Sequence, residues 1–216
     1  MGISADSVRD SYLLAAASAV TLLNQPAVAA AWNRPSALAK LTVGGLAAHL
    51  GRQIIRPVEV IEADPPAEAP VSVLDHYRRS PWTAAGIDDE PNVSVRDNSE
   101  ADAKAGAAAL RERVEAALAT LRQRLSDEPT DRVVALPWTD WPLSLDDFLA
   151  TRVLEIVIHS DDLAVSVGIP TPELPASVTD PVLHLLCRLA TERHGPTAVL
   201  RTLSRSERAP ATISAF

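Results

Sequence analysis

Residues 152–162 read RVLEIVIHSDD and place a glutamate and a histidine four positions apart in an otherwise aliphatic run. Residues three or four apart share one face of a helix, so this segment predicts a helix with a polar stripe. The stripe holds, in order, Phe148, Arg152, Glu155, His159 and Asp162. The neighbouring stripe is wholly apolar, so we expect the polar groups to lie against the core. A carboxylate withdrawn from water is costly unless it is neutralised, and Glu155 therefore needs a partner.

The second candidate helix, with Thr42 as its N-cap, carries a stripe of similar character. It holds, in order, Thr42, Gly45, His49, Arg52 and Arg56. Gly45 removes side-chain bulk one turn before His49, where another group can approach. If both stripes face the interior, His49, Glu155 and His159 converge as three ligands with open positions for a divalent ion. Asp162 would then hold the second nitrogen of His159.

Each of these residues also has a simpler interpretation. Glu155 and His159 can form an ordinary salt bridge, and His49 can be a half-buried histidine bonded to a carbonyl. Arg52 and Arg152 can pair with carboxylates such as Glu59 or Glu155. We interpret the remaining histidines (His76, His184 and His194) as surface residues, Cys187 as a core or near-core residue, and the tryptophans Trp138 and Trp141 as packing residues, with a substrate platform as the alternative.

Helical patterns extend over most of the chain, and no long stretch alternates with period two. We expect helices over about residues 5–24, 43–63 (disturbed at Pro57), 73–80, 101–125, 144–167, 179–192 and 196–206. The fold class is therefore all-α, an antiparallel four-helix bundle with additional C-terminal helices. We place the bundle in residues 1–168 and a short helical extension packed on it in residues 169–216.

Composition excludes several classes of protein. The chain has 216 residues, 47% of them hydrophobic, which indicates one main globular domain. A net charge of −8 without a basic run argues against a nucleic-acid partner. The apolar run YLLAAASAVTLL has an acidic flank and breaks at Pro26, so we expect neither a signal peptide nor a membrane span. The single cysteine fits a reducing, cytoplasmic setting.

The motif Trp32-x-x-Pro35, followed by LTVGGLAAHL at residues 41–50, stands upstream of the block Arg152-x-x-Glu155-x-x-x-His159-x-x-Asp162-Leu163. Together these motifs resemble the mycothiol-dependent maleylpyruvate isomerase family of actinobacteria, within the DinB-like metalloprotein superfamily. The likeness covers about residues 5–168, and the ending AVLRTLSRSERAP looks like the helical tail of related members.

This resemblance implies a DinB-like bundle that holds a metal, commonly zinc, at His49, Glu155 and His159. The isomerase itself carries a separate C-terminal mixed domain, whereas only residues 169–216 follow Gly168 here and read as helices. The specific isomerase reaction therefore does not follow from the resemblance, although the metal site does.

The three candidate metal ligands and the family resemblance together predict a zinc-dependent enzyme that activates a low-molecular-weight thiol, such as mycothiol, for transfer or isomerisation. Its partners would be that thiol and an electrophilic substrate, with Arg52, Arg56 and Arg152 anchoring carboxylates. No catalytic residue is assigned, and the apolar surface is compatible with a homodimer. The alternatives are a non-catalytic or stress-related module with a structural metal, and a metal-free interaction protein with a polar core network.

Overall fold

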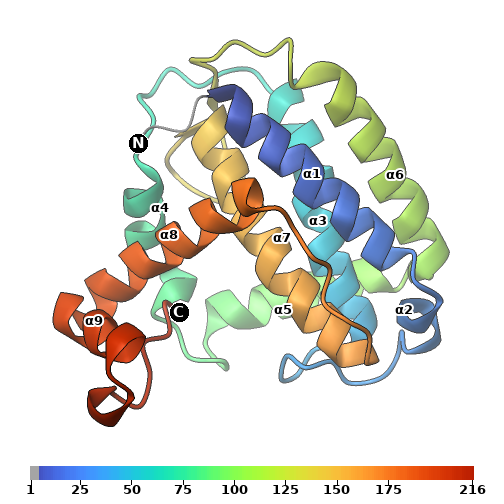
Figure 1. The fold of residues 1–216 in the computed structure, drawn as a ribbon. Helices are drawn as coiled ribbons and strands as arrows, with labels where there is room; N and C mark the ends of the chain where they lie inside the picture. Colours follow the sequence, from blue (N-terminus) through green and yellow to red (C-terminus); the bar gives the residue numbers. More distant parts are fainter. Residues whose placement is uncertain (1–4) are drawn as a thin grey trace.

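Four long helices form the body of the computed structural model, which describes residues 5–216, with side chains from Val8 onward (Figure 1). They are α1 (Ala5–Leu23), α3 (Val43–Glu62), α6 (Gly106–Arg124) and α7 (Leu145–Val167). Helix α1 packs on α7 and α6, and α3 packs on α6 and α7. The expected all-α class and helix bundle are confirmed.

The buried face of α1 is built from small residues around one large side chain. Ala15, Ala16 and Ala19 are fully buried beside Tyr12, whose hydroxyl donates to the carbonyl of Gln53 on α3 at 3.2 Å. Alanines let neighbouring helices approach closely, and the hydrogen bond satisfies the one polar atom that Tyr12 buries. The apolar run near the N-terminus is thus a core helix. Among residues 5–216, no helix is long and apolar enough to span a bilayer.

Local capping residues set the ends of the two helices that carry the polar stripes. Thr42 Oγ1 accepts from the amide of Gly45 at 2.9 Å, and Ser144 Oγ accepts from the amide of Asp147 at 3.0 Å. Gly168, with φ of 71°, ends α7 in the left-handed conformation that favours glycine. Helix α3 runs on through Pro57 to Glu62. The predicted bounds of both helices are confirmed.

The single helix expected over residues 101–125 is wrong in its first turn. The structure has two helices there, α5 (Glu90–Ala103) and α6, separated where Gly106 takes a φ of 84°. The expected helices left out residues 90–100, so most of α5 was not predicted. Proline commonly ends a helix but is favourable in the first helical turn, where its missing N–H has no partner to lose, and Pro91 lies in the first turn of α5.

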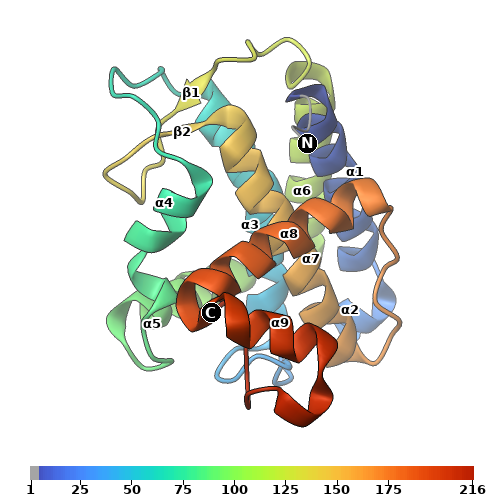
Figure 2. The ribbon, with the colours of Figure 1, turned by 60° about the vertical axis from the view of Figure 1, so that its left-hand side comes forward.

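Helix α2 (Pro26–Ala30) follows α1 and contacts α3 and α7. The other short elements are α4 (Val73–Arg79), the 3₁₀ turn η1 (Pro81–Thr83), and the antiparallel strands β1 (Val133–Val134) and β2 (Leu143–Ser144). The strand pair was not expected from the sequence. Figure 2 shows α4 and the strands on the flank of α3 and α7 away from α1.

The C-terminal elements are α8 (Ala176–His194), α9 (Pro196–Ser204) and the 3₁₀ turn η2 (Ser206–Arg208), and they lie across the front of the bundle in Figure 2. Helix α8 contacts α1 and α7 and buries Val178, Val182, Leu185 and Leu189 in the main core. Cys187 is exposed, so its expected core position is wrong. It lies two positions from Leu185 and from Leu189, on the opposite face of the helix.

Candidate functional site

The structure brings His49 of α3 together with Glu155 and His159 of α7. One ligand atom from each residue lies within 4.8 Å of the other two. Glu155 Oε2 is 3.1 Å from His159 Nε2 and 3.7 Å from His49 Nε2. The three side chains are between 15% and 17% exposed, so they are largely buried but open to one space. The convergence expected from the two polar stripes is therefore present.

In both imidazole rings, the nitrogen that faces away from Glu155 (Nδ1) has a hydrogen-bond partner. Asp162 Oδ2 lies 3.0 Å from His159 Nδ1. Ser99 Oγ lies 3.4 Å from His49 Nδ1 and donates its own proton to the carbonyl of Val95 at 2.7 Å. Because the serine proton is already used, Ser99 accepts from His49 Nδ1–H, and the lone pair of His49 Nε2 faces Glu155. Both rings are thus oriented as in protein sites that hold a metal through Nε2.

Burial and the charges around Glu155 push the pKa values of the two histidines apart. Burial lowers the pKa of His49 to about 4, an effect that the nearby Glu155 only partly offsets. Burial also acts to lower the pKa of His159, but Asp162 and Glu155 outweigh it and raise that pKa to about 9. Burial acts to raise the pKa of Glu155, yet the hydrogen bond from His159 and the nearby His49 hold it well below its usual range.

This charge pattern fits a divalent cation. The buried carboxylate is neutralised by a proton on His159 Nε2, the atom that a metal would contact. Two imidazole nitrogens and one carboxylate oxygen form a ligand set that suits zinc and similar transition ions and leaves further coordination positions open. The residues present therefore fit the metal that the sequence analysis predicts.

A cavity of about 680 Å³ opens directly onto these three residues. Its wall comes from α3, α4, α5 and α7 and from the segment that carries Trp138 and Trp141. The volume lies in the range of small-molecule sites, and the wall combines aromatic rings with many polar and charged side chains. Both tryptophans thus line the cavity, in agreement with the substrate-platform alternative.

The three arginines expected to anchor carboxylates all line the cavity but differ in their partners. Arg52 donates to Asp102 Oδ2 at 2.6 Å from Nη2 and at 3.2 Å from Nε. Arg152 is 8% exposed and donates to Gln53 Oε1 at 2.5 Å. The alternative partners Glu59 and Glu155 therefore form no salt bridge with Arg52 or Arg152 within residues 8–216.

Arg56 keeps its guanidinium unpaired with any carboxylate of the described residues, and stacks it over the Trp138 ring at 4.2 Å. Burial, followed by the charges of Arg52 and Arg152, lowers its pKa to about 10, so it stays cationic near neutral pH. Of the three arginines, Arg56 is the one available to an anionic ligand.

The surface position expected for His76 is wrong. His76 is only 5% exposed, lines the cavity, and accepts a hydrogen bond from Trp141 Nε1 at 3.1 Å. Ser72 precedes the short helix that carries His76 and caps the amide of Asp75. This capping pattern was the only local sequence signal for that helix. His184 is exposed as expected, whereas His194 is half-buried and bonds the carbonyl of Ser214 at 2.7 Å.

Comparison with known proteins gives one family. The profile of the family described as mycothiol maleylpyruvate isomerase N-terminal domain matches residues 13–164, which include α3, α6, most of α7 and the second half of α1. No curated protein and no solved structure matches the chain.

Proposed function

The chain belongs to the mycothiol maleylpyruvate isomerase N-terminal domain family, and from this membership we propose that it is a metal-dependent enzyme acting on a small thiol. The thiol is mycothiol, and the reaction is its transfer to an electrophile or a thiol-assisted isomerisation. One observation carries the proposal: the His49, Glu155 and His159 ligand atoms converge at the wall of a cavity large enough for a small molecule.

His49, Glu155 and His159 are the proposed ligands, and zinc is the proposed metal. Three protein ligands are typical of catalytic zinc, whereas structural zinc usually has four, often including cysteine. The only cysteine of the chain, Cys187, is exposed on α8. When bound, such a cation stabilises a thiolate near neutral pH, which is the reactive form of a thiol.

The remaining residues of the cavity orient and enclose the reactants. Asp162 and Ser99 fix the two imidazole rings, so that Nε2 of each faces the cavity. Arg56 is the proposed partner of a substrate carboxylate, because its guanidinium is free and remains charged. Trp138 and Trp141 line the same cavity, and their proposed role is to limit contact of the bound reactants with water.

Elemental analysis of the purified protein beside a His49→Ala, His159→Ala double variant tests the metal. A His184→Ala variant is the matched control, because His184 is exposed on α8. We expect about one zinc per chain in the parent and in the control, and almost none in the double variant. Equal metal content in all three would refute the ligand assignment.

A second experiment measures how fast the metal-loaded parent protein consumes mycothiol in the presence of cyclohexenone or benzyl chloride. The first electrophile reacts with thiolates by conjugate addition and the second by substitution. Turnover that requires both the metal and mycothiol supports the enzyme. Stoichiometric metal without turnover of either compound would instead support the non-catalytic, metal-binding alternative.

A further inference from the structure

Helix α4 places two uncharged hydrogen-bond donors at the cavity. His76 and Tyr77 are consecutive residues, and both line the space onto which His49, Glu155 and His159 open. Both are also nearly inaccessible to bulk solvent, at 5% and 2% exposure. Neither residue is used by the proposed metal centre, so their polar atoms need a separate explanation.

The hydrogen bond from Trp141 determines which ring nitrogen of His76 carries the proton. Trp141 Nε1 is 3.1 Å from His76 Nδ1, and an indole nitrogen can only donate. His76 Nδ1 must therefore be the acceptor, which puts the ring proton of the neutral imidazole on Nε2. No residue between 8 and 216 accepts from that Nε2, and it is not sealed in the core. Burial, followed by the charge of Arg152, lowers the pKa of His76 to about 4, which keeps the ring neutral.

The hydroxyl of Tyr77 is buried without a hydrogen-bond partner among the described residues. A buried hydroxyl left unpaired destabilises a fold, and native proteins seldom contain one unless a ligand or water completes it. Burial raises the pKa of Tyr77, and the charge of Glu155 raises it further, so the group stays protonated. Tyr77 lines the cavity, and its O–H, which has no partner within residues 8–216, is thus a second uncharged donor beside this space.

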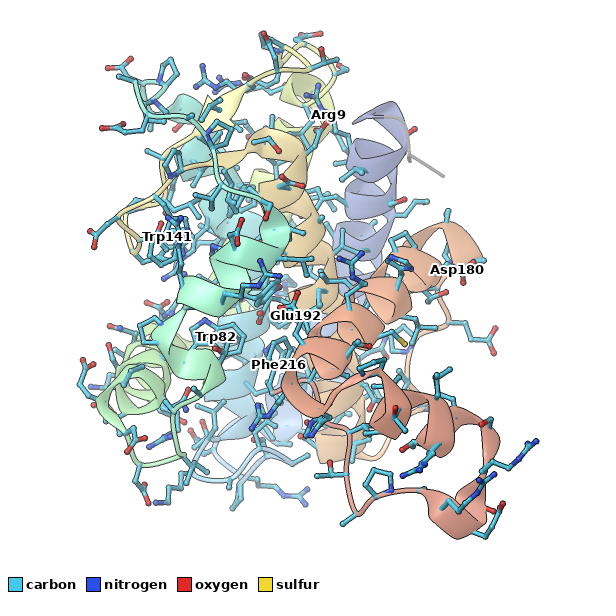
Figure 3. The ribbon with its side chains drawn as sticks, turned by 90° about the vertical axis from the view of Figure 1, so that its left-hand side faces the viewer. Arg9, Trp82, Trp141, Asp180, Glu192 and Phe216 are labelled. Atoms are coloured by element: carbon cyan, nitrogen blue, oxygen red, sulfur yellow. The ribbon has the colours of Figure 1, made fainter. Side chains whose placement is uncertain are left out.

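Contacts behind α4 hold the Tyr77 ring and the helix in place, and the hydrogen bond from Trp141 holds His76. Tyr77 packs against Phe216, with ring centroids 5.6 Å apart, and Phe216 also packs against Trp82 at 5.0 Å. Arg78, the next residue of α4, donates to both carboxylate oxygens of Glu192 on α8. Figure 3 shows Trp82, Glu192 and Phe216 close together where α8 meets α4. The donors are therefore oriented before any ligand arrives.

We infer that His76 Nε2–H and Tyr77 O–H form a subsite that binds one uncharged oxygen acceptor of the ligand, a carbonyl oxygen. Neutral donors suit an uncharged oxygen beside the negative Glu155, whereas an anionic group is served by Arg56. The subsite lies in the cavity of the proposed function and depends on that proposal only for the reaction in which the bound carbonyl takes part.

Nuclear magnetic resonance of ¹⁵N-histidine-labelled, metal-loaded protein tests the subsite with cyclohexanone, a ketone that needs no thiol and undergoes no conjugate addition. We expect the His76 proton on Nε2, and we expect its resonance to shift as cyclohexanone is added. Methylenecyclohexane, which has the same shape without the oxygen, should leave the resonance in place. A proton on Nδ1, or equal shifts with both compounds, would overturn the inference.

Variants of Tyr77 and His76 distinguish hydrogen-bond donation to the ligand from packing by the two rings. Tyr77→Phe removes only the hydroxyl, and His76→Asn keeps an acceptor for Trp141 while removing the donor at the Nε2 position. Each should weaken cyclohexanone binding about fivefold, the effect of one hydrogen bond. His76→Gln, which carries a donor near the Nε2 position, should restore part of the affinity.

Melting of Tyr77→Phe without ligand gives an independent readout. We expect a melting temperature no lower than that of the parent, because the hydroxyl has no partner in the fold to lose. A clear drop would mean that the hydroxyl is bonded within the protein, and the subsite would be rejected. None of these measurements uses mycothiol, so they can succeed even if the proposed thiol chemistry fails.

Discussion

The imidazole rings of His49 and His159 lie 4.7 Å apart between centroids and almost perpendicular, at 89°. One ring comes from α3 and the other from α7, and both direct Nε2 at the same oxygen of Glu155. The three ligand atoms lie within 4.8 Å of one another, close enough for one ion to contact all of them. This arrangement is the geometric basis for the predictions about metal binding.

Asp162→Asn should weaken zinc binding by about 10- to 100-fold, because the carboxylate orients His159 and increases its basicity through Nδ1. Competition with a chromogenic chelator measures the change. Asp161→Asn is the matched control, since Asp161 is exposed and, within residues 8–216, its side chain bonds only Thr171. Equal affinities for the two variants would show that Asp162 has no role in holding the metal.

Arg56→Gln should raise KM for a carboxylate-bearing electrophile by about tenfold and leave kcat nearly unchanged, as expected for a lost charge-assisted hydrogen bond outside the reacting atoms. Steady-state kinetics with an acidic electrophile and its methyl ester check this, because the ester should be insensitive to the variant. Arg79→Gln is the control, since Arg79 is exposed and lies over Trp141 at 5.8 Å. A fall in kcat alone would contradict the anchoring role.

Arg9→Met should destabilise the fold by about 3 kcal/mol, because buried carbonyls and a carboxylate lose their donor. Arg9 is 5% exposed, donates to Asp146 Oδ1 at 3.0 Å, and bonds three carbonyls between residues 125 and 129. Urea unfolding followed by circular dichroism measures the loss. Arg124→Met should change stability by less than about 1 kcal/mol, because the side chain of Arg124 is 41% exposed and its closer ion pair, with Glu62, lies at the surface.

Gly51→Ala should destabilise the bundle by about 1–3 kcal/mol through overpacking between α3 and α6. An added Cβ would lie 2.8 Å from Leu110 Cδ1 and 3.0 Å from Val114 Cγ1. The control is Gly86→Ala, where the nearest atom, in the exposed side chain of Asp89, is 3.4 Å away. Thermal melting of both variants gives the comparison, and similar melting temperatures would show that the interface can relax.

His76 should make folding less favourable as the pH falls. Burial, then the charge of Arg152, lowers its folded pKa to about 4, whereas an unfolded histidine titrates near about 6.5. The unfolded chain therefore takes up a proton first, and stability is lost between about pH 6.5 and pH 4. The free energy of unfolding of the parent relative to His76→Asn should fall across this interval, as urea titrations can measure. A constant difference would contradict a neutral, buried His76.

Local rules explain why so much of α3 and α7 was predictable. Thr42 and Ser144 cap the amides three residues ahead, and Gly168 supplies the left-handed stop, so each boundary depends only on nearby residues. The room left at Gly45 was also predicted. It is filled by Glu100, whose Oε1 would lie 2.5 Å from an added Cβ and accepts from the amide of Thr42 at 2.7 Å.

These local rules failed at residues that are compatible with more than one structure, such as a proline, which can lie in a loop or in the first turn of a helix. Pro91 suggested a loop but stands in the first turn of α5, and as a result the helix that carries Ser99 was not foreseen. Without α5, the hydrogen bond that orients His49 could not be anticipated. His76 looked like a surface residue because its seven-residue helix has too few turns to show a periodic apolar face.

By itself, the sequence determined that Glu155, His159 and Asp162 share one helix face and that His49 lies on the polar stripe of a second helix, because the helical repeat fixes which residues share a face. Only the tertiary structure decided which polar groups are already paired. Arg52 is bound to Asp102, while Arg56 is free and Trp141 sets the proton of His76. Such pairings join residues far apart in the chain, so they depend on how the helices pack and not on the order of residues within a helix.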